Sequence, residues 1–156
     1  MNNYWRTNYV GGQGDEFTFR YVITSGSKLT PGKMSRFGWG QMTPIEVDKI
    51  STNDKIYGQS HSANESERSF LNVDSRDVVL INWKRAQDNH GTIMCFMELN
   101  GKSENVKINT PLVQLDSVWL CDAMERNKLS LPVSGNGFSF FIKPFHILTI
   151  RINRSL

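Results

Sequence analysis

Residues that could take part in binding or catalysis cluster first at the N-terminal end of the chain. An amide, aromatic and hydroxyl set lies there within a few positions: Asn2, Asn3, Trp5, Thr7 and Asn8. Amides that both donate and accept hydrogen bonds, placed beside an aromatic face, are the combination that sugar recognition uses. In the structural alternative, the asparagines satisfy loop backbone groups and Trp5 fills a domain interface. The five residues are therefore candidates for the edge of a sugar pocket, with the structural alternative open.

The other ionisable side chains form no recognisable catalytic or metal-binding motif. His61, His90 and His146 show neither a His-x-Asp nor a His-x-His spacing, so they do not present clustered metal ligands. Asp15 and Glu16 are adjacent and would point to opposite faces of a strand. Two carboxylates that act on one bond must instead converge on it. We predict no catalytic residue and no metal ligand in this chain.

The cysteines and the glycine-rich stretch also lack catalytic partners. Cys95 and Cys121 lie in apolar segments without a neighbouring histidine, which favours small buried side chains over a disulfide or a nucleophile. The Gly-Gly-Gln-Gly stretch at 11–14 lacks the Lys-Ser/Thr ending of a phosphate-binding loop and precedes a strand pattern. We interpret it as a turn.

Charge and hydropathy exclude two classes of partner. The 156 residues carry 18 basic and 15 acidic side chains, a net charge of +3, and no basic run is longer than Lys84-Arg85. Nucleic-acid surfaces need clustered cations, so we expect no nucleic-acid partner. No apolar run approaches the roughly 18 residues of a membrane span, so we expect no membrane partner. Neither the cysteines nor the polar start of the chain identifies a compartment, and localisation stays unknown.

Period-two alternation dominates the chain and predicts strands. Apolar residues alternate with polar ones from Phe17 to Ile23, which predicts a half-buried strand. A short helix is expected over 35–42 before Pro44, and a surface loop over 59–68. Further strands are expected at 69–73, 77–85, 92–99, 104–109, 114–122, 137–143 and 145–152, separated by turn signals at 89–91, 100–101 and 134–137. This spacing predicts an all-β chain, an antiparallel β-sandwich with immunoglobulin-like or supersandwich-like strands and at most one or two short helices.

Four residues in these strands carry specific expectations. Trp83 and Trp119 fall on predicted strands and are expected in the core. Pro144 cannot donate to a ladder, so it should lie at a bend or an edge. Phe141 gives its strand apolar side chains on both faces, which predicts packing on two sides, as between the sandwich and another domain.

Motif blocks spread over most of the chain resemble one enzyme family. They comprise 1–9, 12–21, 69–73, 78–86, 91–99, 121–126 and 137–152. In order and content they are similar to the C-terminal β region of glycoside hydrolase family 38, the class II α-mannosidases. The resemblance implies a retaining hydrolase whose aspartate nucleophile and divalent metal, commonly zinc, belong to an N-terminal catalytic domain. The chain itself would then hold no cofactor and would be inactive alone.

The resemblance also implies an organisation and a set of partners. Residues 1–60 would be the closing strands of a large β domain plus a linker, and residues 61–156 the terminal β-sandwich. The partners would be the catalytic domain of the same polypeptide and, through the parent enzyme, a mannose-containing glycan. Unpaired strands would favour a dimer. The alternative is a free-standing carbohydrate-binding or protein-interaction sandwich, which needs an exposed Trp or Tyr platform, whereas a bracing domain exposes a broad apolar face.

Overall fold

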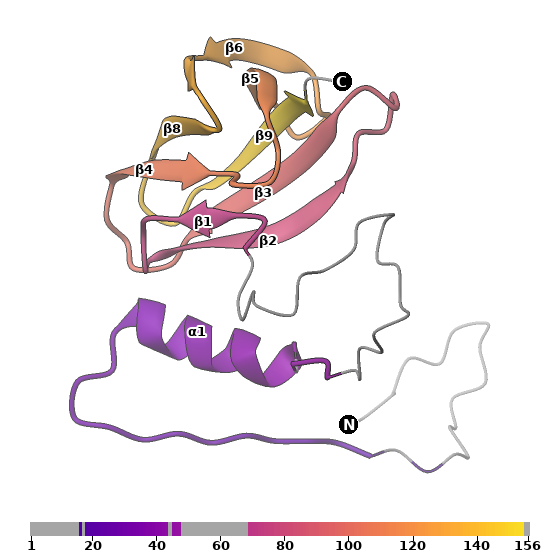
Figure 1. Ribbon diagram of the computed structural model, residues 1–156. Helices are drawn as coiled ribbons and strands as arrows, with labels where there is room; N and C mark the ends of the chain where they lie inside the picture. Colours follow the sequence, from indigo (N-terminus) through magenta and orange to yellow (C-terminus); the bar gives the residue numbers. More distant parts are fainter. Residues whose placement is uncertain (1–15, 17, 44, 48–68, 155–156) are drawn as a thin grey trace, which may run out of the picture.

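A computed structural model describes residue 16 and residues 18–43, 45–47 and 69–154 (Figure 1). Within them lie one helix and nine strands. They are α1 (Pro31–Met42), β1 (Asn72–Val73), β2 (Val78–Arg85), β3 (Thr92–Glu98), β4 (Glu104–Asn109), β5 (Leu115–Cys121), β6 (Asn127–Leu131), β7 (Val133–Ser134), β8 (Gly137–Ile142) and β9 (Ile147–Arg154).

The strands form two sheets that face each other (Figure 1). One sheet has four strands in the order β1-β4-β8-β7, and the other has five in the order β2-β3-β9-β5-β6. All strand pairs are antiparallel. The predicted antiparallel β-sandwich with one short helix is confirmed.

The core fills the space between the two sheets. Alternate residues on each strand point inward, so burial along β8 and β4 switches at every position. Phe96 on β3 meets Phe140 on β8 across the interface, with ring centroids 5.1 Å apart at 44°. Burying each such large side chain stabilises the fold by about 1.5–3 kcal/mol. This packing holds the two sheets together and fixes which side chains remain outside.

Predicted and observed strands agree best in the middle of the chain. The bounds of β2, β3, β4, β5 and β8 match the expected ranges to within a residue or two, while β9 begins two residues later than expected. Strands β6 and β7 were not predicted. In β6 the apolar alternation is limited to Leu129 and Leu131, which is too short to predict a strand, and β7 has only two residues and follows Pro132. Pro144 lies in the turn between β8 and β9, which confirms the predicted bend.

Helix α1 begins four residues before its predicted start. Thr30 is the N-cap: its hydroxyl oxygen accepts a hydrogen bond from the backbone N–H of Lys33 at 3.3 Å, and Pro31 occupies the first turn. The start of the helix rests against the sandwich at Gly32, where an added Cβ would lie 2.9 Å from Asp77 Oδ1. Thr-Pro is thus a start signal here, whereas the prediction began the helix only at residue 35.

Three expectations about exposure and pairing are corrected. Residues 18–23 form neither strand nor helix, and Tyr21 and Ile23 are exposed, because a period-two pattern becomes a strand only where a neighbouring strand completes the ladder. Trp83 is 43% exposed and is not a core residue. Trp119 is half-buried and pairs with Arg151 on β9. Phe141 is exposed on the outer face of β8, so its predicted packing against another domain stays a prediction.

Candidate functional site

The five candidate sugar-pocket residues lie outside the residues that the structure describes. They are Asn2, Asn3, Trp5, Thr7 and Asn8. Their role stays a prediction. Three surfaces of the sandwich itself can be built from the described residues: a groove on the four-stranded sheet, and an apolar row and a charged cluster on the five-stranded sheet.

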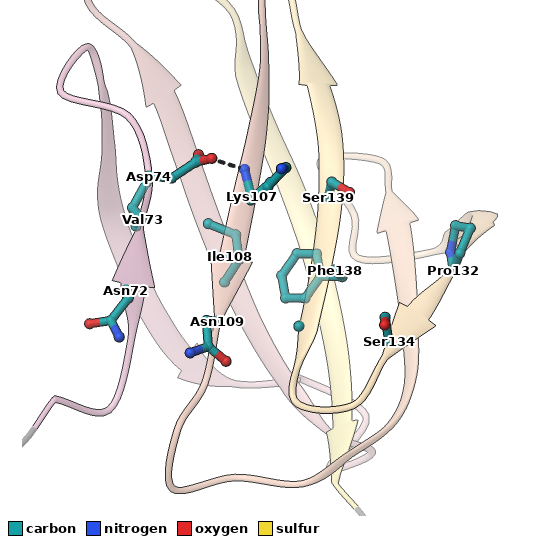
Figure 2. A pocket seen from close by; sticks show the side chains of 11 residues that line it. Asn72, Val73, Asp74, Lys107, Ile108, Asn109, Pro132, Ser134, Phe138 and Ser139 are labelled. Atoms are coloured by element: carbon teal, nitrogen blue, oxygen red, sulfur yellow. Dashed lines mark hydrogen bonds between the residues drawn. The ribbon is translucent and has the colours of Figure 1, made fainter.

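The groove lies on the outer face of the four-stranded sheet and encloses about 540 Å³ (Figure 2). Its floor is backbone from β4 and β8, and Gly137 contributes no side chain. Polar side chains from β1, β4, β7 and β8 surround the floor: Asn72, Asp74, Lys107, Asn109, Ser134 and Ser139. The groove therefore offers amide, hydroxyl and ammonium groups for hydrogen bonding.

The one carboxylate of the groove already has a structural partner. Asp74 Oδ1 accepts a hydrogen bond from the backbone N–H of Lys107 at 2.7 Å, and the Asp74 N–H donates to Lys107 O at 3.1 Å. These two bonds continue the pairing of β1 with β4 past Val73. The lining includes Phe138, which is buried, and no tryptophan or tyrosine. The groove thus suits hydrogen bonding to a polar surface and lacks a platform for stacking a sugar ring.

The outer face of the five-stranded sheet is apolar at one end. Val79, Met97 and Ile147 pair side by side across β2, β3 and β9, and we call them the apolar row. The adjacent residues Leu80, Phe96 and Leu148 pack into the core, so the apolar row points outward. Ile147 is 54% exposed, and Val79 and Met97 are half-buried. These residues were not predicted as a surface feature. The predicted strands 77–85 and 92–99 carry apolar residues on both faces, and this pattern could have indicated an apolar outer surface.

A charged cluster organises the other end of the same face. The guanidinium of Arg151 is buried and donates to Asp88 Oδ2 at 2.7 Å, to His90 O at 2.9 Å and to Glu125 O at 2.7 Å. The His90 N–H and the Arg151 guanidinium lower the pKa of Asp88. Glu125 pairs with Lys84, which lowers the pKa of its carboxyl. One arginine thereby ties the β2–β3 turn to the β5–β6 turn, which is a structural role.

The two cysteines lie on this face as well, with β9 between them. Cys95 and Cys121 both pair with Thr149, so two strand spacings of roughly 4.8 Å separate them. Their Cα atoms are therefore too far apart for a disulfide, which requires less than about 7 Å. Burial raises the pKa of the Cys121 thiol, which disfavours the nucleophilic thiolate. Both cysteines are free.

The described residues contain no group of three or more His, Cys, Asp or Glu side chains placed to hold a metal ion. His90 lies in the β2–β3 turn and His146 in the β8–β9 turn, and both are exposed. His61 lies outside the described residues. In the part of the chain that the structure covers, no helix has the length and apolar character needed to cross a membrane.

Comparison with protein families identifies the sandwich. Residues 77–150 match the family described as "Glycosyl hydrolases family 38 C-terminal beta sandwich domain". The match begins just before β2 and ends within β9, so it spans the five-stranded sheet and most of its partner. No curated protein matches the chain. Over residues 77–150, the sandwich is therefore similar to the C-terminal β-sandwich domain of glycosyl hydrolase family 38.

Proposed function

We propose that this chain is the non-catalytic C-terminal β domain of an α-mannosidase-like glycoside hydrolase and that it braces the catalytic domain of that enzyme. The observation that carries the proposal is the exposed apolar row on a domain similar to that of this family. Single exposed apolar side chains are ordinary on a protein surface, whereas neighbouring ones on one face mark an interface.

The geometry of the apolar row suits a broad domain contact. Val79, Met97 and Ile147 lie on three adjacent strands, so they present one continuous apolar surface across the sheet. Phe145, two residues before Ile147, is also exposed and extends the apolar surface to the β8–β9 turn. Covering such side chains contributes roughly 25 cal/mol per Å² of apolar area. The occupant we assign is the catalytic domain of the same polypeptide.

The polar groove weighs against the alternative of a free-standing carbohydrate binder that uses this sheet. A stand-alone sugar platform needs an exposed aromatic ring, and the groove lining supplies none. Under the proposal, the retaining hydrolysis of α-mannosidic bonds belongs to the catalytic domain, which would supply the aspartate nucleophile and a divalent metal, commonly zinc in the family that the chain resembles. The mannose-containing glycan would reach this chain only through the parent enzyme.

Reconstitution of the two parts tests the proposal. The purified chain and a family 38 catalytic domain from the same genome are produced separately, and hydrolysis of p-nitrophenyl α-mannoside is measured with and without zinc. We expect no turnover by the chain alone. We expect the chain to bind the catalytic domain and to raise its activity or its melting temperature. Ile147→Lys should weaken this complex by about 2 kcal/mol, roughly thirtyfold in Kd, because it forces a charge against an apolar contact.

Met124→Lys is the matched control, because Met124 is exposed in the β5–β6 turn at the other end of the same face. It should leave the complex unchanged. Metal-dependent turnover by the pure chain would contradict the absence of catalytic machinery. An equal loss in both lysine variants, or no complex at all, would contradict the bracing role.

A further inference from the structure

A second hollow lies at the end of the sandwich, beside the β2–β3 turn, and encloses about 700 Å³. We call it the Trp83 cleft. Its lining comes from β2, β3, β9 and the adjoining loops: Trp83, Arg85, Asn89, Gly91, Thr92, Val113, Ile152, Asn153 and Arg154. None of these residues belongs to the apolar row or to the polar groove.

Strand register explains why the Trp83 cleft is open. Trp83 pairs with Met94, and Met94 is fully buried in the core, so both side chains lie on the inner side of the five-stranded sheet. Trp83 is nevertheless 43% exposed. Arg85 pairs with Thr92, the next inward position along the sheet. Here the inner face is not covered as it is at Met94, and an aromatic ring and an arginine are left at the surface.

The charge of the Trp83 cleft is one-sided. Arg85 and Arg154 line it, and the lining contains no aspartate or glutamate. The ion pairs formed among the described residues involve neither of these arginines. Asn89 adds an amide. The Asn153 side chain lies on the other face of the sheet, where its Nδ2 donates to Ser117 Oγ at 2.9 Å. The cleft therefore combines one aromatic face, two guanidinium groups and the amide of Asn89.

We propose that the Trp83 cleft binds an acidic sugar residue, a pyranose that carries a carboxylate or a phosphate. The indole face would stack on the apolar face of the sugar ring. The guanidinium groups match the two oxygens of a carboxylate or phosphate, and the Asn89 amide matches a ring hydroxyl. The excess of arginine over acidic side chains selects an anionic sugar over a neutral one.

A single-stranded nucleic acid also combines stacking with negative charge, but the surface favours a single sugar residue. Single-strand binders use successive aromatic side chains along a basic track. The Trp83 cleft has one tryptophan, and the chain as a whole carries a net charge of only +3. The sugar proposal does not rest on the bracing role, because none of its residues belongs to the apolar row.

Isothermal titration calorimetry with two matched sugar pairs tests the proposal: glucuronic acid against glucose, and mannose 6-phosphate against mannose. Inorganic phosphate and a short single-stranded oligonucleotide are titrated as well. We expect at least one acidic sugar to bind about tenfold or more tightly than its neutral partner and than inorganic phosphate. Trp83→Ala and Arg85→Gln should each reduce that affinity about tenfold.

Two variants outside the cleft serve as controls. Trp39→Ala removes a tryptophan of equal exposure, 43%, from helix α1, and Arg126→Gln removes an arginine from the β5–β6 turn. Both should bind like the unmodified chain. Arg85→Gln keeps the test decisive if Trp83→Ala destabilises the fold, because Arg85 is an exposed side chain. Equal affinity for acidic and neutral sugars, tighter binding of the oligonucleotide or of phosphate alone, or full affinity in Arg85→Gln would overturn the proposal.

Discussion

At the scale of single residues, Glu98 is the most consequential polar side chain in the fold. It is completely buried at the end of β3. Its carboxylate accepts hydrogen bonds from the backbone N–H groups of Asn100 at 2.7 Å, Gly101 at 2.8 Å and Phe145 at 2.8 Å. One side chain thus holds the β3–β4 and β8–β9 turns together. Burial raises the pKa of Glu98, but the backbone donors outweigh it and the net pKa is lowered from its ordinary value of 4.5.

This lowered pKa predicts a loss of stability in acid. The unfolded chain binds the proton at a higher pH than the folded chain does, so the stabilisation is complete above about pH 4.5 and declines as the pH falls through the folded pKa. Glu98→Gln should lower the free energy of unfolding by about 3 kcal/mol at neutral pH and flatten this acid dependence. Urea unfolding followed by circular dichroism between pH 7 and pH 3 measures both effects. Glu46→Gln alters an exposed position and should change neither the free energy of unfolding nor its dependence on pH. Identical plots of unfolding free energy against pH for the two variants would refute this role of Glu98.

Residue types alone predicted one candidate site, at the N-terminal end of the chain, and gave a wrong expectation for Trp83. The amide and aromatic set at the N-terminal end followed from residue types, but it lies outside the described residues. Trp83 was expected in the core because its strand pattern is apolar, and its exposure depends on how far the opposite sheet extends. Arg151 gave no signal in the sequence, because its three acceptors come from turns 26 to 63 positions away.

At the scale of elements, two turns of the five-stranded sheet are fixed by local chemistry. In the β5–β6 turn, Asp122 Oδ1 accepts hydrogen bonds from the N–H groups of Met124 at 2.9 Å and Arg126 at 3.0 Å. The Arg126 N–H is the main cause that lowers the pKa of Asp122 to about 2. In the β2–β3 turn, Asn89 and Gly91 have positive φ angles of 63° and 83°. The Asn-His-Gly signal therefore predicted this turn correctly.

Gly91 offers a sharp test at this scale. A Cβ added there would lie 2.2 Å from Asn153 Oδ1 and 2.6 Å from Ile152 O, and the positive φ is strained for any other residue. Gly91→Ala should lower the free energy of unfolding by about 3 kcal/mol. Gly38→Ala is the matched control, because an added Cβ in helix α1 meets nothing within 4 Å. It should be neutral or stabilising by up to about 1 kcal/mol in the same denaturant titration. A harmless Gly91→Ala would show that this turn is not tightly packed.

At the scale of the whole molecule, the hydrophobic core found among the described residues lies within the sandwich. The buried core cluster and the apolar residues packed against it all lie between Leu71 and Ile152. Helix α1 lies beside the sandwich and not between its sheets (Figure 1), and its one buried residue is Gly32. The division into residues 1–60 and 61–156 stays a prediction, because its boundary lies outside the described residues.

Removal of residues 1–68 should change the free energy of unfolding by less than about 1 kcal/mol, because no residue of the described core is lost. Thermal and urea unfolding of both chains measure the difference, and a loss of several kcal/mol would show that the N-terminal part completes the fold.

Sedimentation velocity on the same samples tests the predicted dimer through unpaired strands. The edge strands β1 and β7 have only two residues each and β2 carries a register shift after Leu80, which leaves β6, with five residues, as the edge best able to pair with a second copy. A dimer that survives the truncation would therefore require contact through the sandwich.

The sequence by itself determined the fold class, the central strands and the main turns of this protein. These depend on local properties: alternation with period two, glycine and asparagine at positive φ, and proline at a bend. Only the tertiary structure decided which apolar faces are covered, because burial depends on a partner sheet far away in the sequence. Met94 and Trp83 share one side of a sheet, yet Met94 is buried and Trp83 is exposed. Strand register brings together residues from β2, β3 and β9 in both the apolar row and the Trp83 cleft. The apolar row lies on the outer face of its sheet, whereas Trp83 lies on the inner face at a place that the second sheet leaves uncovered.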